Sequence, residues 1–219
     1  MKVVILALSY KNRGICLAGL DLDTYEFVRL GHNENGICKP MNVNEMYIGD
    51  HLLKLLDVVD VVAIKMSYDG CQTENYSFIR FETYLGKMSY FDLNAIYQKL
   101  PRHQFAMVNT SKKVSSNDMH SVDYSLGLFK VNNLNVILSP NQHGNLRPQS
   151  SFDYNGHRYI CLSTTDADVS GYPAIYAPRK APFKATEAFV LISFPPKSDP
   201  YTQDCGYFKY VSGIILSDI

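Results

Sequence analysis

The sequence predicts a mostly β protein with two lobes, and three observations support this prediction. Short apolar runs separated by turn residues recur along the 219-residue chain, as is typical of strands. Sixteen tyrosines and eleven phenylalanines, with no tryptophan, suit a β-rich fold. Clear helical periodicity is confined to one segment. A chain of this length forms either one large all-β domain or two small ones.

The first half opens with a predicted meander of three strands, over residues 3–8, 15–22 and 25–30. A loop rich in Gly, Asn and Pro follows over residues 32–44. The next strong strand covers residues 55–64, and a second loop covers residues 66–76. Apolar residues then recur with helical spacing over residues 90–100 and stop at Pro101, which predicts an amphipathic helix.

The second half is predicted to contain a further set of strands. Residues 126–131 and 134–138 suggest a hairpin around Asn132 and Asn133, a pair suited to a tight turn. Residues 151–154 and 156–163 flank the turn signal Asn155-Gly156, and residues 188–193 and 207–216 complete the set. We expect the two lobes to meet somewhere in residues 100–145.

Charge and cysteine content narrow the class of protein. The chain has 21 basic residues (Lys and Arg) and 21 acidic residues (Asp and Glu). Residues 99–147 carry a local excess of positive charge, with six basic and two acidic residues. Such an excess indicates either a solvated loop or a nucleic-acid path. Five scattered cysteines, without a C-x-x-C pair or a signal peptide, predict a reducing, cytoplasmic location, and Cys16 and Cys161 are expected as buried thiols. The absence of an 18-residue apolar stretch argues against a membrane span.

Patterns typical of enzymes are mostly missing. The chain has no P-loop, no G-x-S-x-G elbow and no H-E-x-x-H. His103, His120, His143 and His157 are too irregularly spaced to favour a shared metal over separate surface histidines. Asp166 and Asp168 suit either a cation or an ordinary turn. We therefore expect no catalytic residue, cofactor or metal.

Several polar residues allow a binding role as well as a structural one. Asn155 and His157 form either a turn with its cap or one edge of a ligand groove. Lys11, Arg13 and Arg29 are either exposed charges or phosphate contacts. Arg29 lies two residues after Phe27, so both share a sheet face. That pair either stacks on bases or simply covers an aromatic ring.

The order of several motifs resembles the dual OB-domain family of bacteria. They are residues 13–24, 27–29, 55–59, 72–76, 152–159, 164–166 and 209–215. The resemblance implies two tandem OB-like barrels, residues 1–100 and 101–219, with one short amphipathic helix between or capping them. It also implies an accessory role in bacterial anti-phage or conflict systems. The polar positions in matching motifs are Arg13, Arg29, Glu74, Asn75, Arg147, Asn155 and His157, of which Glu74 and Asn75 alternatively hold a loop.

The leading hypothesis is therefore a non-enzymatic module that engages single-stranded nucleic acid or a nucleotide. In it, Lys11, Arg13 and Arg29 contact phosphate, and Tyr10 and Phe27 stack on bases. Arg147 and His157 extend the path over the second barrel. One alternative is an adaptor that joins an effector protein encoded nearby, which the neutral net charge favours. The other is a small enzyme that acts on nucleotides or nucleic acid through Asp166, Asp168 and a histidine.

Overall fold

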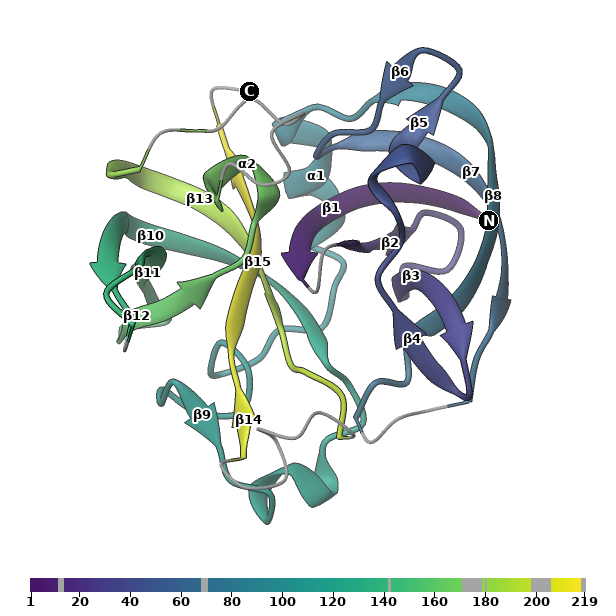
Figure 1. Ribbon diagram of the computed structural model, residues 1–219. Helices are drawn as coiled ribbons and strands as arrows, with labels where there is room; N and C mark the ends of the chain where they lie inside the picture. The colour runs from purple at the N-terminus through teal and green to yellow at the C-terminus, as the bar shows by residue number, and fades with distance from the viewer. Residues whose placement is uncertain are drawn as a thin grey trace.

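The computed structural model describes residues 1–11, 14–67, 71–141, 143–170, 179, 181–197 and 206–217, and the side chains of Lys11 and Ser121 are not described. Two curved sheets lie side by side, one from each half of the chain (Figure 1). The predicted mostly β, two-lobed architecture is confirmed.

The first sheet closes into a barrel. Its hydrogen-bonded order is β2-β1-β7-β8-β3-β4, and β2 also pairs with β3, so the ring closes and only β4 stays outside it. The strands are β1 (Lys2–Lys11), β2 (Gly14–Asp21), β3 (Phe27–Glu34), β4 (Ile37–Lys39), β7 (Asp57–Lys65) and β8 (Asn75–Lys87).

The second sheet is a closed barrel with the order β10-β11-β12-β15-β13. Its strands are β10 (Leu126–Pro140), β11 (Leu146–Tyr154), β12 (His157–Thr164), β13 (Phe183–Ser193) and β15 (Tyr210–Leu216). Asn155 and Gly156, with φ of 48° and 77°, form the predicted tight turn between β11 and β12.

The two barrels have the same topology. In each ring the first strand pairs with the second and fourth, and the third pairs with the fifth. The third and fifth strands run parallel, β3 with β8 and β12 with β15, whereas all other ring pairs are antiparallel. A short helical turn precedes the fourth strand in both, η1 (Val43–Met46) and α2 (Ala167–Ser170). This arrangement is the five-stranded Greek-key barrel of the OB fold.

Helix α1 (Tyr90–Tyr97) follows the first barrel, as the periodicity predicts. The Ser89 hydroxyl caps it by accepting a hydrogen bond from the Asp92 N–H at 3.0 Å. The rings of Tyr90 and Tyr97 pack on Phe189 of β13, with centroids 5.0 and 5.2 Å apart, so the helix bridges the barrels (Figure 1). The remaining elements are β5 (Tyr47–Ile48), β6 (His51–Leu52), β9 (Lys113–Val114), η2 (Asp118–Ser121) and β14 (Tyr207–Phe208).

Strand β1 explains why the chain opens on a continuous apolar run. Residues 3–8 are at most 2 % exposed, although alternate side chains of a strand point to opposite faces. One face fills the first barrel, and the other packs on β15 of the second. Gly213 of β15 permits this close approach, because a Cβ there would lie 2.1 Å from the carbonyl oxygen of Leu6. One core cluster therefore includes residues of both barrels.

Some elements differ from the sequence prediction. Asn132 and Asn133 do not form a hairpin: β10 runs straight through them, and Asn133, with φ of 52°, accommodates an irregularity in the pairing with β11. The predicted loop over residues 32–44 contains the end of β3 and all of β4. Strand β8 was missed. The boundary at residue 100 stays a prediction.

Candidate functional site between the barrels

The β2–β3 side of the first barrel faces the second barrel and encloses a pocket of about 360 Å³. The first barrel contributes residues of β1, β2, β3 and β4, together with Gln72. The second contributes Leu126 of β10, Thr165, the end of β13, the Phe194-Pro195-Pro196 segment and two residues of β15. OB folds bind ligands on the face of strands 2 and 3, so this pocket occupies the expected binding face.

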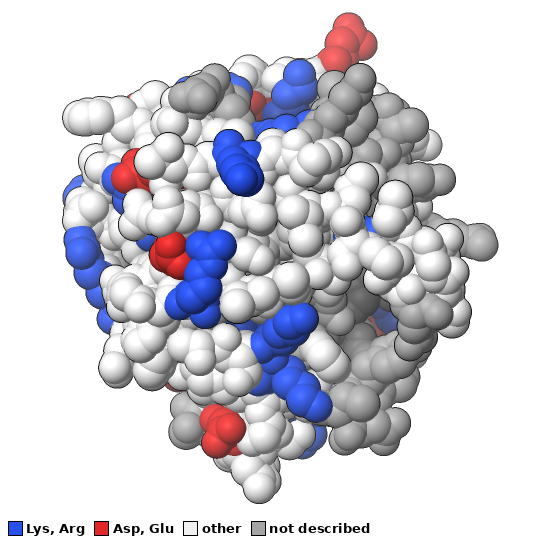
Figure 2. Space-filling view, turned by 90° about the vertical axis from the view of Figure 1, so that its left-hand side faces the viewer, with Lys and Arg blue, Asp and Glu red and all other residues white. Residues whose placement is uncertain are grey.

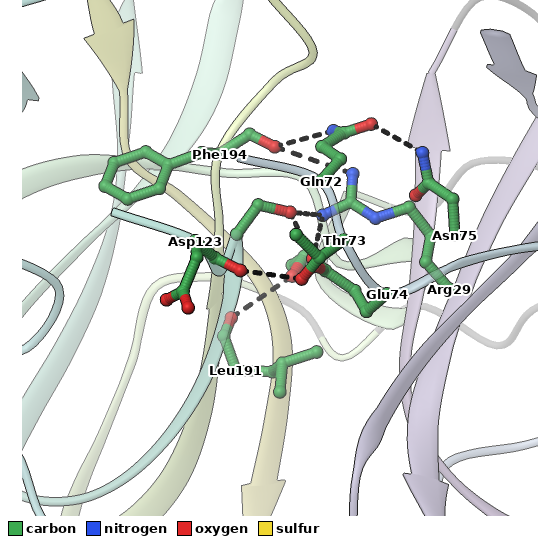
Figure 3. A network of polar contacts seen from close by, with 10 residues as sticks. Arg29, Gln72, Thr73, Glu74, Asn75, Asp123, Leu191 and Phe194 are labelled. Atoms are coloured by element: carbon green, nitrogen blue, oxygen red, sulfur yellow. Dashed lines mark hydrogen bonds and ion pairs between the residues drawn. The ribbon is translucent and has the colours of Figure 1, made fainter. Parts of the chain in front are cut away.

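Arg29 of β3 lies at the wall of this pocket, in a buried polar network (Figure 3). Its Nη2 donates to the Ser125 hydroxyl at 2.7 Å and lies 3.4 Å from Oε1 of Glu74. Ser125 also donates to Glu74. The side chains of Arg29 and Glu74 are only 12 % and 6 % exposed. Arg29 of the first barrel is therefore hydrogen-bonded to Ser125, the residue before the first strand of the second barrel, and links the two halves of the chain.

Gln72 and Asn75 extend the network. The Gln72 side-chain amide donates to the carbonyl oxygen of Phe194 at 3.1 Å and accepts from the Asn75 amide at 3.2 Å (Figure 3). Both side chains are buried. Glu74 and Asn75 thus hold the segment before β8 in place, the structural alternative for these two residues. Arg29 Nε and Glu74 Oε2 are nevertheless buried without a hydrogen-bond partner.

Apart from Lys39, the other described residues of the lining are uncharged. Ser9 of β1 donates to the Thr165 hydroxyl at 2.7 Å, and the Tyr10 N–H donates to the Thr165 carbonyl oxygen at 3.0 Å. Cys16 and Cys38 also line the pocket. Burial raises the pKa of the Cys38 thiol to about 11 although Arg29 lowers it, so the thiol stays protonated at neutral pH. Cys16 is half-buried at this wall, not a core thiol as expected.

The structure gathers some of the predicted binding residues and separates others. Arg29, Glu74 and Asn75 meet in the network, and Tyr10 and Phe27 are half-buried beside the shared core. Lys11 ends β1, and Arg13 lies outside the described residues. Arg147 is exposed near the start of β11, whereas Asn155 and His157 lie beyond its other end. Hence Arg147 and His157 do not share one site.

Asn155 and His157 contact the segment that leads into the second barrel. The Asn155 side-chain amide donates to the carbonyl oxygen of His103 at 3.1 Å, and the His157 ring lies 4.9 Å from that of Phe105. These contacts fit the structural interpretation of the turn. Ser125, Gln72 and Phe194 were not singled out as binding residues. Only the residue 72–76 motif pointed towards them.

The predicted basic path is not continuous over the second barrel. Figure 2 shows Lys and Arg side chains scattered on this side of the molecule, some beside acidic groups, on a largely uncharged surface. Lys130 lies 3.0 Å from Glu187, and Arg158 lies 2.9 Å from Asp153. The aromatic residues of β11 and β12, Phe152, Tyr154 and Tyr159, are all buried. The described outer face of these strands therefore offers no Phe or Tyr ring for base stacking.

Asp166, one of the two acidic residues considered for catalysis, is buried and hydrogen-bonded to the backbone. Asp166 is 1 % exposed, and its carboxylate accepts hydrogen bonds from the backbone N–H groups of Ile214 at 2.6 Å and Asp168 at 2.9 Å. Burial, with Asp168 beside it, raises the pKa of Asp166 to about 7.

Among the described residues, no three His, Cys, Asp or Glu side chains are grouped to hold a metal ion. The described helices include none long and apolar enough to cross a membrane.

Comparison with known proteins agrees with this topology. No curated protein and no solved structure matches the chain. The profile of one family, described as the dual OB-containing domain, matches residues 1–214 of the 219. With two barrels of OB topology over the same residues, the chain belongs to the dual OB-containing domain (DuOB) family.

Proposed function

We propose that this protein is a non-enzymatic binding module whose ligand is a nucleotide-sized molecule held between its two OB barrels. The observation that carries the proposal is the pocket of about 360 Å³ on the β2–β3 side of the first barrel. Its volume falls in the usual range of small-molecule sites, about 300–1,000 Å³. Following the family resemblance, the module acts as a sensor or accessory component of a bacterial defence system.

A nucleotide fits these features better than a long single strand. Strand binding uses an open basic groove with exposed aromatic platforms. Here the second barrel covers the binding face of the first, and Arg29 is 12 % exposed. The chain as a whole carries equal numbers of basic and acidic residues. A single-stranded oligonucleotide is therefore the weaker candidate.

Isothermal titration calorimetry with the full chain tests this proposal. Adenosine, guanosine, their monophosphates and triphosphates, and single-stranded DNA and RNA oligonucleotides are titrated separately. We expect saturable binding of at least one nucleoside or nucleotide. Steeply salt-dependent oligonucleotide binding, without any mononucleotide binding, would favour the strand-binding hypothesis instead.

A pocket-filling variant locates the site. Ala18 of β2 is 5 % exposed and lines the pocket, so Ala18→Phe should abolish nucleotide binding. Ile160 of β12 is 58 % exposed and lies outside the pocket lining, so Ile160→Phe is the matched control. Circular dichroism verifies that both variants fold. Equal loss of binding in the two variants, or no loss in a folded Ala18→Phe, would contradict the location.

An adaptor function is the second candidate, and exposed apolar side chains favour it. Ile64 of β7, Ile79 and Leu85 of β8 and Phe91 of α1 are 62, 48, 44 and 78 % exposed. Nuclease-resistant co-purification with the product of a neighbouring gene tests this function. Substituting Ile79 and Phe91 with serine should release that partner, while nucleotide binding stays unchanged.

A further inference from the structure

The cations of the inter-barrel pocket already have carboxylate partners. Two basic side chains, Arg29 and Lys39, line the described pocket. Arg29 Nη2 lies 3.4 Å from the buried Glu74, and Lys39 Nζ lies 3.8 Å from Glu34. Sites for polyphosphates present an excess of cations, a metal ion or a glycine-rich loop of backbone N–H groups. The described lining has little positive charge left to balance a triphosphate.

The rest of the described lining is uncharged. Hydroxyl, thiol and amide groups, among them Ser9, Thr165, Cys38 and Gln72, alternate with aliphatic side chains such as Leu30 and Leu126. Ligand pockets of this composition bury apolar or aromatic surface and use a few polar groups to fix its orientation. This composition suits a heterocyclic base and a sugar better than a chain of phosphates.

We propose that the pocket binds the base and sugar of a nucleotide carrying at most one phosphate. This inference rests on the proposed function, because it specifies the ligand of the same pocket. It also predicts that the pocket discriminates against polyphosphates.

A phosphate series tests the charge argument. Adenosine, AMP and ATP, and guanosine, GMP and GTP, are titrated calorimetrically into the full chain at about 0.15 M salt, where charges separated by more than about 8 Å are screened. For the base that binds, we expect the nucleoside and monophosphate to agree within about threefold and the triphosphate to bind at least about tenfold more weakly, a difference of about 1.4 kcal/mol. A triphosphate that binds as tightly as the nucleoside would overturn the inference but leave the proposed function standing. Failure of every compound would overturn both.

Discussion

The guanidinium of Arg29 donates a hydrogen bond of 2.7 Å to the hydroxyl of Ser125, which links strand β3 of the first barrel to the residue that precedes β10 of the second. Ser125 is fully buried, and the carboxylate of Glu74 joins both groups. The binding face of the first barrel is thus also an interface between barrels.

The first prediction concerns the buried ion pair. Arg29→Met should lower the free energy of unfolding by about 3 kcal/mol, because Glu74, 6 % exposed, loses its charged partner. Urea denaturation measures the effect. Adding Glu74→Gln should recover part of the loss, and a cost below about 0.5 kcal/mol for the single variant would show that the pair is not needed for stability.

The second prediction concerns the contact between β1 and β15. Gly213→Ala should destabilise the protein by about 2–3 kcal/mol, because its Cβ would lie 2.1 Å from the Leu6 carbonyl oxygen and would force the barrels apart. Gly49→Ala is the control: its Cβ meets nothing within 4 Å, and only its φ of 58° opposes the change, at about 1 kcal/mol. Equal costs in urea denaturation would contradict the close-packing argument.

The third prediction is a pH dependence from Asp166. Its pKa is raised from 3.8 to about 7 in the folded protein, so between these values the folded state binds a proton that the unfolded state does not. Stability should therefore fall as pH rises from about 4 to about 7, with a slope of at most about 1.4 kcal/mol per pH unit. Asp166→Asn should remove this contribution, whereas Asp50→Asn at an exposed position should not. Identical pH profiles for wild type and Asp166→Asn would refute it.

The fourth prediction concerns Lys209, which is 1 % exposed and donates to the carbonyl and side-chain oxygens of Asn109. Burial lowers its pKa from 10.5 to about 7, so between these values the unfolded state binds the extra proton. Stability should rise with pH from about 7 to about 10, by at most about 1.4 kcal/mol per unit. Lys209→Met should flatten this rise, and Lys113→Met, an exposed position, should keep it. Melting temperatures of the wild type and both variants, measured from about pH 7 to about pH 10, test this prediction.

Local patterns predicted many of the elements. The meander, the helix at residues 90–97 and the Asn155-Gly156 turn were all identified, because an apolar run, a helical period and a turn pair depend on neighbouring residues. The hairpin predicted at Asn132 and Asn133 is wrong, because a residue pair that favours a tight turn equally allows a bulge in a continuous strand. Strand β8 was overlooked although Tyr76, Phe78 and Tyr84 mark its aromatic character.

The sequence by itself determined the β-rich class, the order of most strands and, through spaced motifs, the family. Only the tertiary structure decided what Arg29 does. A charged residue in a half-apolar strand has the same sequence pattern whether its side chain meets water or another barrel. The pocket walls come from residues as distant as Ser9, Cys38 and Phe194, and closure of two rings and their packing through Gly213 brings these together. Such contacts depend on long-range geometry, which no local window of sequence contains.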